Sequence, residues 1–133
     1  MIEDTILNGY RSVAVVGLSP DPNRPSHKVA SYLAQHGYEI IPVNPDAREI
    51  LGRPSYPDLQ SLPQSVEIVD IFRRSEEVMP IVDEAIKIGA KAVWMQEGVI
   101  NEAAAARARD AGLLVVMNKC MLKEHRRLSK ELG

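Results

Sequence analysis

The residues best suited to chemistry lie in a turn that follows an apolar run near the N-terminus. In "VAVVGLSPDPNRPSHKVASYL" the run ends at Gly17, a hydroxyl follows at Ser19, and a helical pattern begins at Ser26. Phosphate binds to backbone N–H groups where a glycine permits close approach and the positive end of a helix is near. The turn therefore predicts an anion site. The alternative is a surface loop in which Gly17 only makes a tight turn.

This turn departs from the two common nucleotide-binding motifs. Leu18 and Ser19 follow Gly17, so G-x-G-x-x-G lacks its second and third glycines, and the P-loop pattern is also absent. The next apolar run ends in Asn44 and Pro45, where an NAD site favours an acidic residue for the ribose hydroxyls. NAD is therefore disfavoured as the ligand.

The other reactive side chains form no catalytic group that the sequence can establish. Cys120 is the single cysteine, so it excludes an internal disulfide and cannot alone form a structural zinc site. We expect it at the start of the last helix, where backbone amides favour a thiolate; a small buried residue is the alternative. We expect His27, His36 and His125 on helix surfaces or in packing contacts, and Asp70 in a buried hydrogen bond.

Composition excludes several classes of protein. The chain has 133 residues and a net charge of −2, so no basic excess indicates nucleic acid as a partner. No stretch approaches the roughly 20 apolar residues of a membrane span. We expect one domain over residues 1–133, in the cytoplasm and without a membrane partner.

A repeating pattern of strand and helix runs through the chain. Three helical segments end at Gly37, Gly89 and Gly112, each suited to the left-handed residue that closes a helix, and an apolar run follows each one. Continuous Val/Ile/Leu/Met runs are typical of strands buried on both faces. Strands are predicted at 13–17, 39–43, 66–72, 91–95 and 113–117.

Capping residues predict where the intervening helices begin. Ser26, Ser75 and Asn101 are the expected N-caps, and Pro80 predicts a bend or a shifted start in the second of these helices. Residues 45–65 hold four prolines and predict a winding loop with a short helix or strand. The segment "CMLKEHRRLSKEL" predicts a final amphipathic helix.

Together these elements predict an α/β, Rossmann-like fold. We expect an open, mostly parallel sheet of about five or six strands with helices on both faces. Ligands of such sheets bind beyond the carboxyl ends of the strands. Polar residues follow every predicted strand, which favours a site at that edge.

Three stretches of the chain carry a resemblance to a known family. They are "VVGLSPDPNRPSHKVASYLAQHGYEIIPVNP", "IVDIFRRSEEV" and "AVWMQEGVINEAAAARARDAGLLVVMNKCM". In this order they resemble the motifs of the small stand-alone coenzyme A-binding proteins, whose domain is similar to the CoA-binding domain of succinyl-CoA synthetase and of NDP-forming acyl-CoA synthetases. The resemblance covers nearly the whole chain.

The resemblance implies a position along CoA for each matching residue. The diphosphate loop comprises Gly17, Leu18 and Ser19, with Arg24, Ser26 and Lys28 beside it. Asn44, Pro45 and Arg48 fall where the family holds the adenosine, Phe72 and Arg73 border the pantetheine arm, and Gln96 and Gly98 lie near the thiol. The alternatives are a solvated surface for Arg48, Arg73 and Lys28, and a core position for Phe72.

The function implied is binding of CoA, or an acyl-CoA, by a carrier, sensor or regulatory module without chemistry of its own. In the related synthetases a phosphorylated histidine lies in a further domain. A further hypothesis is that the CoA thiol reaches Cys120 and forms a mixed disulfide with it. The alternative is a nucleotide-dependent enzyme, either an NAD-type oxidoreductase or a ligase component. A homo-oligomer or an unidentified protein partner also stays open.

Overall fold

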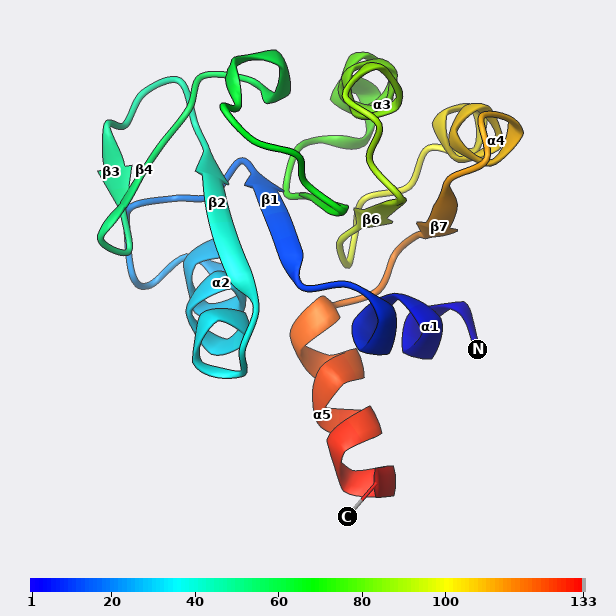
Figure 1. Cartoon of the computed structure of the whole chain (residues 1–133), viewed down its shortest axis with the longest axis horizontal. Helices are drawn as coiled ribbons and strands as arrows, with labels where there is room; N and C mark the ends of the chain where they lie inside the picture. Colours follow the sequence, from blue (N-terminus) through cyan, green and yellow to red (C-terminus); the bar gives the residue numbers. More distant parts are fainter. Residues whose placement is uncertain (133) are drawn as a thin grey trace.

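The computed structural model describes residues 1–132 and builds them around a five-stranded parallel sheet (Figure 1). The predicted Rossmann-like α/β fold is confirmed, and the predicted strands coincide with the observed ones apart from their end residues. Gly133, the last residue of the expected domain, lies outside the described residues. The strands, in spatial order, are β2 (Glu39–Val43), β1 (Ser12–Val16), β5 (Ile68–Ile71), β6 (Ala92–Met95) and β7 (Leu114–Val116).

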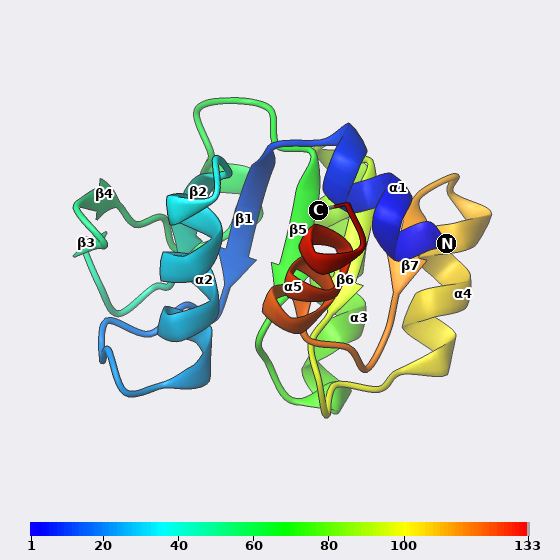
Figure 2. The same cartoon turned by 90° about the horizontal axis from the view of Figure 1, so that it is seen from below.

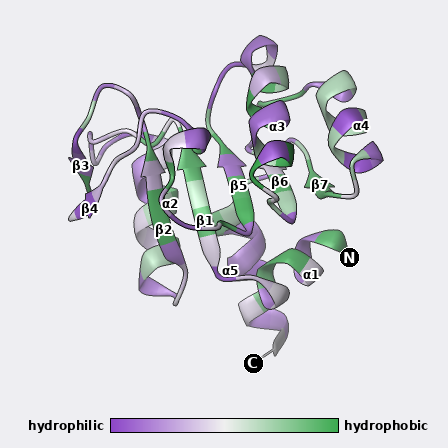
Figure 3. Cartoon of the chain, turned by 45° about the horizontal axis from the view of Figure 1, so that its top comes forward, coloured by the Kyte–Doolittle hydropathy of each residue, from purple (hydrophilic) through white to green (hydrophobic). Residues whose placement is uncertain are grey.

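Helices cover both faces of the sheet, as Figures 1 and 2 show. One face carries α3 (Val78–Lys87) and α4 (Glu102–Asp110); the other carries α1 (Ile2–Gly9), α2 (Pro25–Gln35) and α5 (Met121–Leu132). Successive strand residues point to opposite faces, so each strand contributes to both apolar cores. The central strands are accordingly hydrophobic along most of their length (Figure 3).

Local sequence explains most of the helix ends. Gly37, Gly89 and Gly112 have φ values of 92°, 76° and 91°, which confirms the predicted left-handed conformation after each helix. Asn101 is the predicted N-cap of α4, and its Oδ1 accepts a hydrogen bond of 2.9 Å from the N–H of Ala104.

Two of the three predicted N-caps are wrong. The N-cap of α2 is Arg24, and Ser26 lies inside the helix with its hydroxyl accepting from the N–H of Ser19. Ser75 lies in a 3-10 turn, η2 (Ser75–Glu77), and its hydroxyl accepts from the N–H of Ile100. The Ser75 hydroxyl thus binds a loop that is distant along the chain, whereas the Ser26 hydroxyl binds the loop that leads into its own helix. The start of α3 is shifted to Val78, as the proline in its first turn predicted.

The segment 45–65 forms a short hairpin and a 3-10 turn. The hairpin pairs β3 (Glu49–Ile50) with β4 (Arg53–Pro54), and η1 (Leu59–Ser61) follows. The N-terminal helix α1 was not predicted. Among the described residues, no helix has the length and apolar character needed to cross a membrane.

Candidate functional site

The sheet order places a crevice between the ends of β1 and β5. The chain leaves β1 toward β2 on one side, and it leaves β5 toward β6 and β7 on the other. In open parallel sheets, the point where strand order reverses is where ligands bind, beyond the carboxyl ends. Gly17 and Phe72 stand at this position, one after each strand.

Gly17 permits a close approach of these two strand exits. Its φ is +88°, and a Cβ built on it would lie 2.3 Å from the carbonyl oxygen of Phe72. Its N–H donates to the carbonyl of Val43 at 2.9 Å, so this amide is already used within the sheet edge. The glycine is therefore required by the backbone packing of the crevice, and its N–H is not available to a ligand.

The following loop uses some amides and leaves others free. The N–H of Ser19 donates to the Ser26 hydroxyl at 2.9 Å, and the Ser19 hydroxyl accepts from the N–H of Asp21 at 3.1 Å. Among the described residues, the N–H groups of Leu18 and Ser26 have no acceptor. Ser26 belongs to the first turn of α2, whose N–H groups lack intrahelical partners and carry partial positive charge. Leu18 is fully buried, so the Ser26 N–H is the free amide that an anion can reach.

Two cavities meet at the crevice and differ in charge. The basic cavity, about 500 Å³, lies on the side of α2 and α5 and includes the cations Arg24, Arg73 and Arg74. The acidic cavity, about 420 Å³, lies on the side of α3, shares Gly17 and Arg73, and includes four carboxylates: Asp58, Glu76, Glu77 and Glu84. A polyanion fits the basic cavity and is repelled from the acidic one.

Arg24 is the cation of the basic cavity that carries no acidic partner within the described residues. Arg73 binds Glu77 at 3.2 Å, and Arg74 binds the same carboxylate at 3.4 Å. Glu97, the carboxylate of this cavity, is paired with Lys123 at 3.0 Å, and this hydrogen bond raises the pKa of the lysine. The cavity therefore offers one free guanidinium, that of Arg24, together with the free amide of Ser26.

Eight of the residues singled out from the sequence converge on the basic cavity. They comprise the turn, the start of α2 and the ends of three strands: Gly17, Ser19, Arg24, Ser26, Phe72, Arg73, Gln96 and Cys120. Val29 and Val99 also line it and were not predicted. Val29 follows Ser26 by three residues, so helical spacing could have indicated that it faces the same way.

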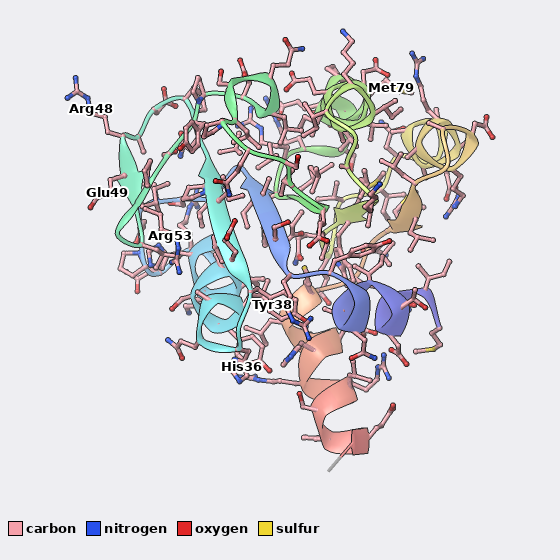
Figure 4. The ribbon with its side chains drawn as sticks, viewed as in Figure 1. His36, Tyr38, Arg48, Glu49, Arg53 and Met79 are labelled. Atoms are coloured by element: carbon pink, nitrogen blue, oxygen red, sulfur yellow. The ribbon has the colours of Figure 1, made fainter. Side chains whose placement is uncertain are left out.

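The other predicted site residues lie elsewhere. Leu18 is fully buried, backbone included, and lines neither cavity. Lys28 is exposed and lies outside both cavities, as does Gly98, whose N–H donates to the Oδ1 of Asn118 at 2.8 Å. Pro45 lines the acidic cavity. Arg48 stands on the hairpin and points away from the body of the molecule (Figure 4).

Asn44 connects two strand exits. Its Nδ2 donates to the carbonyl of Leu18 at 2.9 Å, and its Oδ1 accepts from the N–H of Asp46 at 2.8 Å. Both ends of the amide are thus occupied by the protein. The position after β2, where an NAD site holds the ribose, offers no carboxylate.

The expected hydrogen bond of Asp70 is absent. This carboxyl is fully buried in β5, between Val15 of β1 and Trp94 of β6, and neither oxygen has a partner among the described residues. Burial raises the pKa of Asp70 well above its ordinary value, because the charged form is poorly solvated there. Burial therefore favours the neutral form of this carboxyl.

Comparison with known proteins shows which family the chain resembles. Residues 11–126 match the family model described as a CoA binding domain. An uncharacterized protein, YneT of Bacillus subtilis, is 38% identical over 90% of this chain and 89% of its own length. A hypothetical protein from Pyrococcus horikoshii has the same fold, with a TM-score of 0.92 and 44% identity over 99% of this chain and 90% of its own.

A larger enzyme shares the same region. Acetate–CoA ligase (ADP-forming) II of Archaeoglobus fulgidus is 33% identical over 69% of this chain, which corresponds to 14% of the ligase. The similarity thus concerns one part of that enzyme. From the family model and its fold, this chain belongs to the CoA-binding domain family.

Proposed function

We propose that this protein binds CoA or an acyl-CoA in the basic cavity and performs no chemistry of its own. The observation that supports this most is that the unpaired Arg24 and the free amide of Ser26 line the same cavity. CoA carries a diphosphate and a 3′-phosphate, and arginine binds phosphate through two parallel hydrogen bonds.

The remainder of the cavity suits the uncharged part of CoA. Phe72, Val29 and Val99 supply apolar walls for the pantetheine arm, which would run from the turn after β1 toward Gln96 after β6. These strands are two places apart in the sheet, a span of about 10 Å. A carrier, sensor or regulatory module would need only this binding.

Calorimetric titration of ligand-free protein tests the proposal. We expect CoA to bind with micromolar affinity, and NAD and ADP to bind far more weakly, because they lack the pantetheine arm. Arg24→Gln should weaken CoA binding about tenfold, the typical effect of losing a hydrogen bond to a charged group. Arg109→Gln, which changes an exposed arginine of α4, is the matched control and should leave the affinity unchanged.

A further variant tests the position predicted from the family resemblance alone. Arg48→Gln should leave CoA binding unchanged if the adenosine stays near the crevice, and should weaken it if the hairpin folds over the ligand. Preference for NAD over CoA, or equal binding by wild type and Arg24→Gln, would contradict the proposed function.

A further inference from the structure

Gln96 presents an unpaired hydrogen-bond donor to the basic cavity. It is the first residue after β6, it is 3% exposed, and it lines the cavity. Its side-chain oxygen accepts from the N–H of Met121 at 3.2 Å. A backbone N–H can only donate, so this contact fixes which end of the amide is oxygen. The Nε2 group has no partner among the described residues and is not enclosed by the protein, so it is accessible from the cavity.

The surroundings of this donor are largely apolar. Phe72, Val29 and Val99 line the same cavity, and Cys120 immediately precedes the residue that holds the glutamine oxygen. An accessible amide N–H without a protein acceptor is free to donate to a ligand. A ligand group that fits here is therefore small and mostly apolar, with one strong acceptor. A thiol is a weak acceptor, whereas a thioester carbonyl oxygen is a strong one.

We propose that the site recognises the thioester of a short-chain acyl-CoA in preference to free CoA. The Nε2 of Gln96 donates to the thioester carbonyl oxygen, and the acyl group packs against Phe72 and Val99. This inference rests on the proposed function, because it assumes that the pantetheine arm lies in the basic cavity. It identifies the group at the end of that arm as a short-chain acyl thioester.

Titrations with three related ligands isolate the carbonyl. Acetyl-CoA, its thioether analogue S-ethyl-CoA and free CoA differ in the presence of the carbonyl and of the two-carbon group. The wild type should bind acetyl-CoA about threefold to tenfold more tightly than S-ethyl-CoA, the typical effect of one neutral hydrogen bond. Gln96→Met has a similar volume and no donor, so it should bind both ligands equally. The exposed Gln60→Met should keep the wild-type ratio.

The outcomes separate this inference from the proposed function. If the wild type binds all three ligands with equal affinity, or if Gln96→Met keeps the preference for acetyl-CoA, the thioester inference is wrong and CoA binding stands. If the wild type binds none of the three, both are wrong. Even if Gln96→Met fails to fold, the comparison of acetyl-CoA with S-ethyl-CoA on the wild type tests whether the site recognises the thioester carbonyl.

Discussion

At the scale of single residues, we predict that Cys120 forms a mixed disulfide with CoA. It lines the cavity and is partly exposed. With CoA disulfide, its thiolate would attack one sulfur, break the S–S bond and release one CoA as the thiol. We expect intact-mass spectra to show one adduct per chain. No adduct, or an adduct that persists in Cys120→Ser, would contradict this.

Asp70 is the residue whose substitution should raise stability. Because its pKa is raised in the folded state, the native protein keeps a proton that the unfolded chain releases near pH 4. The free energy of unfolding should therefore fall as pH rises from about 4 toward the native pKa. Asp70→Val should remove this slope and add about 1–3 kcal/mol at neutral pH, since no unsatisfied polar group stays buried.

Urea unfolding at several pH values between 4 and 8 measures this effect. Asp70→Asn is the matched control: it cannot titrate but keeps a buried polar group, so it should lose the pH slope without the gain in stability. A slope in Asp70→Val as steep as in the wild type would show that other groups cause it.

At the scale of elements, α5 is held against α2 by a cluster of rings. His125 of α5 lies 2.8 Å from the Tyr32 hydroxyl, and its ring is 5.1 Å from that of His36 and 5.7 Å from that of Tyr38. His36 and Tyr38 are labelled in Figure 4. Burial, and then the nearby His36 and Arg11, lower the pKa of His125.

This cluster should make the attachment of α5 sensitive to acid. A lowered pKa means that the folded state favours neutral His125, so its contribution is present above about pH 6.5 and is lost as pH falls through the folded-state pKa. We expect the melting temperature to fall between pH 7.5 and 5.5, and to fall less in His125→Gln. An equal decrease in both proteins would exclude His125 as the cause.

The N-terminal helix α1 also depends on distant partners. Ile6 and Leu7 are buried in the core on the face of the sheet that carries α1, α2 and α5. Two ion pairs also hold the helix: Glu3 binds Lys119, and Asp4 binds Arg127 at 2.5 Å. The hydrogen bond from Lys119 is the main cause of the lowered pKa of Glu3. The sequence of α1 is short and has no side-chain cap, so local signals alone did not predict it.

At the scale of the whole molecule, CoA should stabilise the folded state. A ligand at about 100 times its Kd adds about 2.7 kcal/mol, which corresponds to a rise in melting temperature of roughly 10 °C for a chain of this size. High salt should reduce the rise, because it screens the attraction between phosphate and Arg24. Differential scanning fluorimetry measures both effects. An equal rise with NAD would contradict selective binding of CoA.

Much of the fold and part of the site could be predicted from the chain alone. Buried strands are continuous apolar runs, and a helix that turns sharply into a strand needs a left-handed residue at its end. Asn101 caps its own helix. Each of these signals is local in the sequence. The turn after β1 could be predicted for the same reason. The order of three motifs then indicated the CoA-binding family.

Only the tertiary structure decided which groups remain available to a ligand. The turn after β1 was expected to bind an anion through backbone N–H groups, but those of Gly17 and Ser19 donate to Val43 and Ser26. Gln96 keeps a free donor because its oxygen accepts from the N–H of Met121. Asp70 likewise lost the hydrogen bond expected of it. Hydrogen-bond partners far apart in the sequence meet only when the strands and helices pack, so residue types and spacing alone cannot specify them.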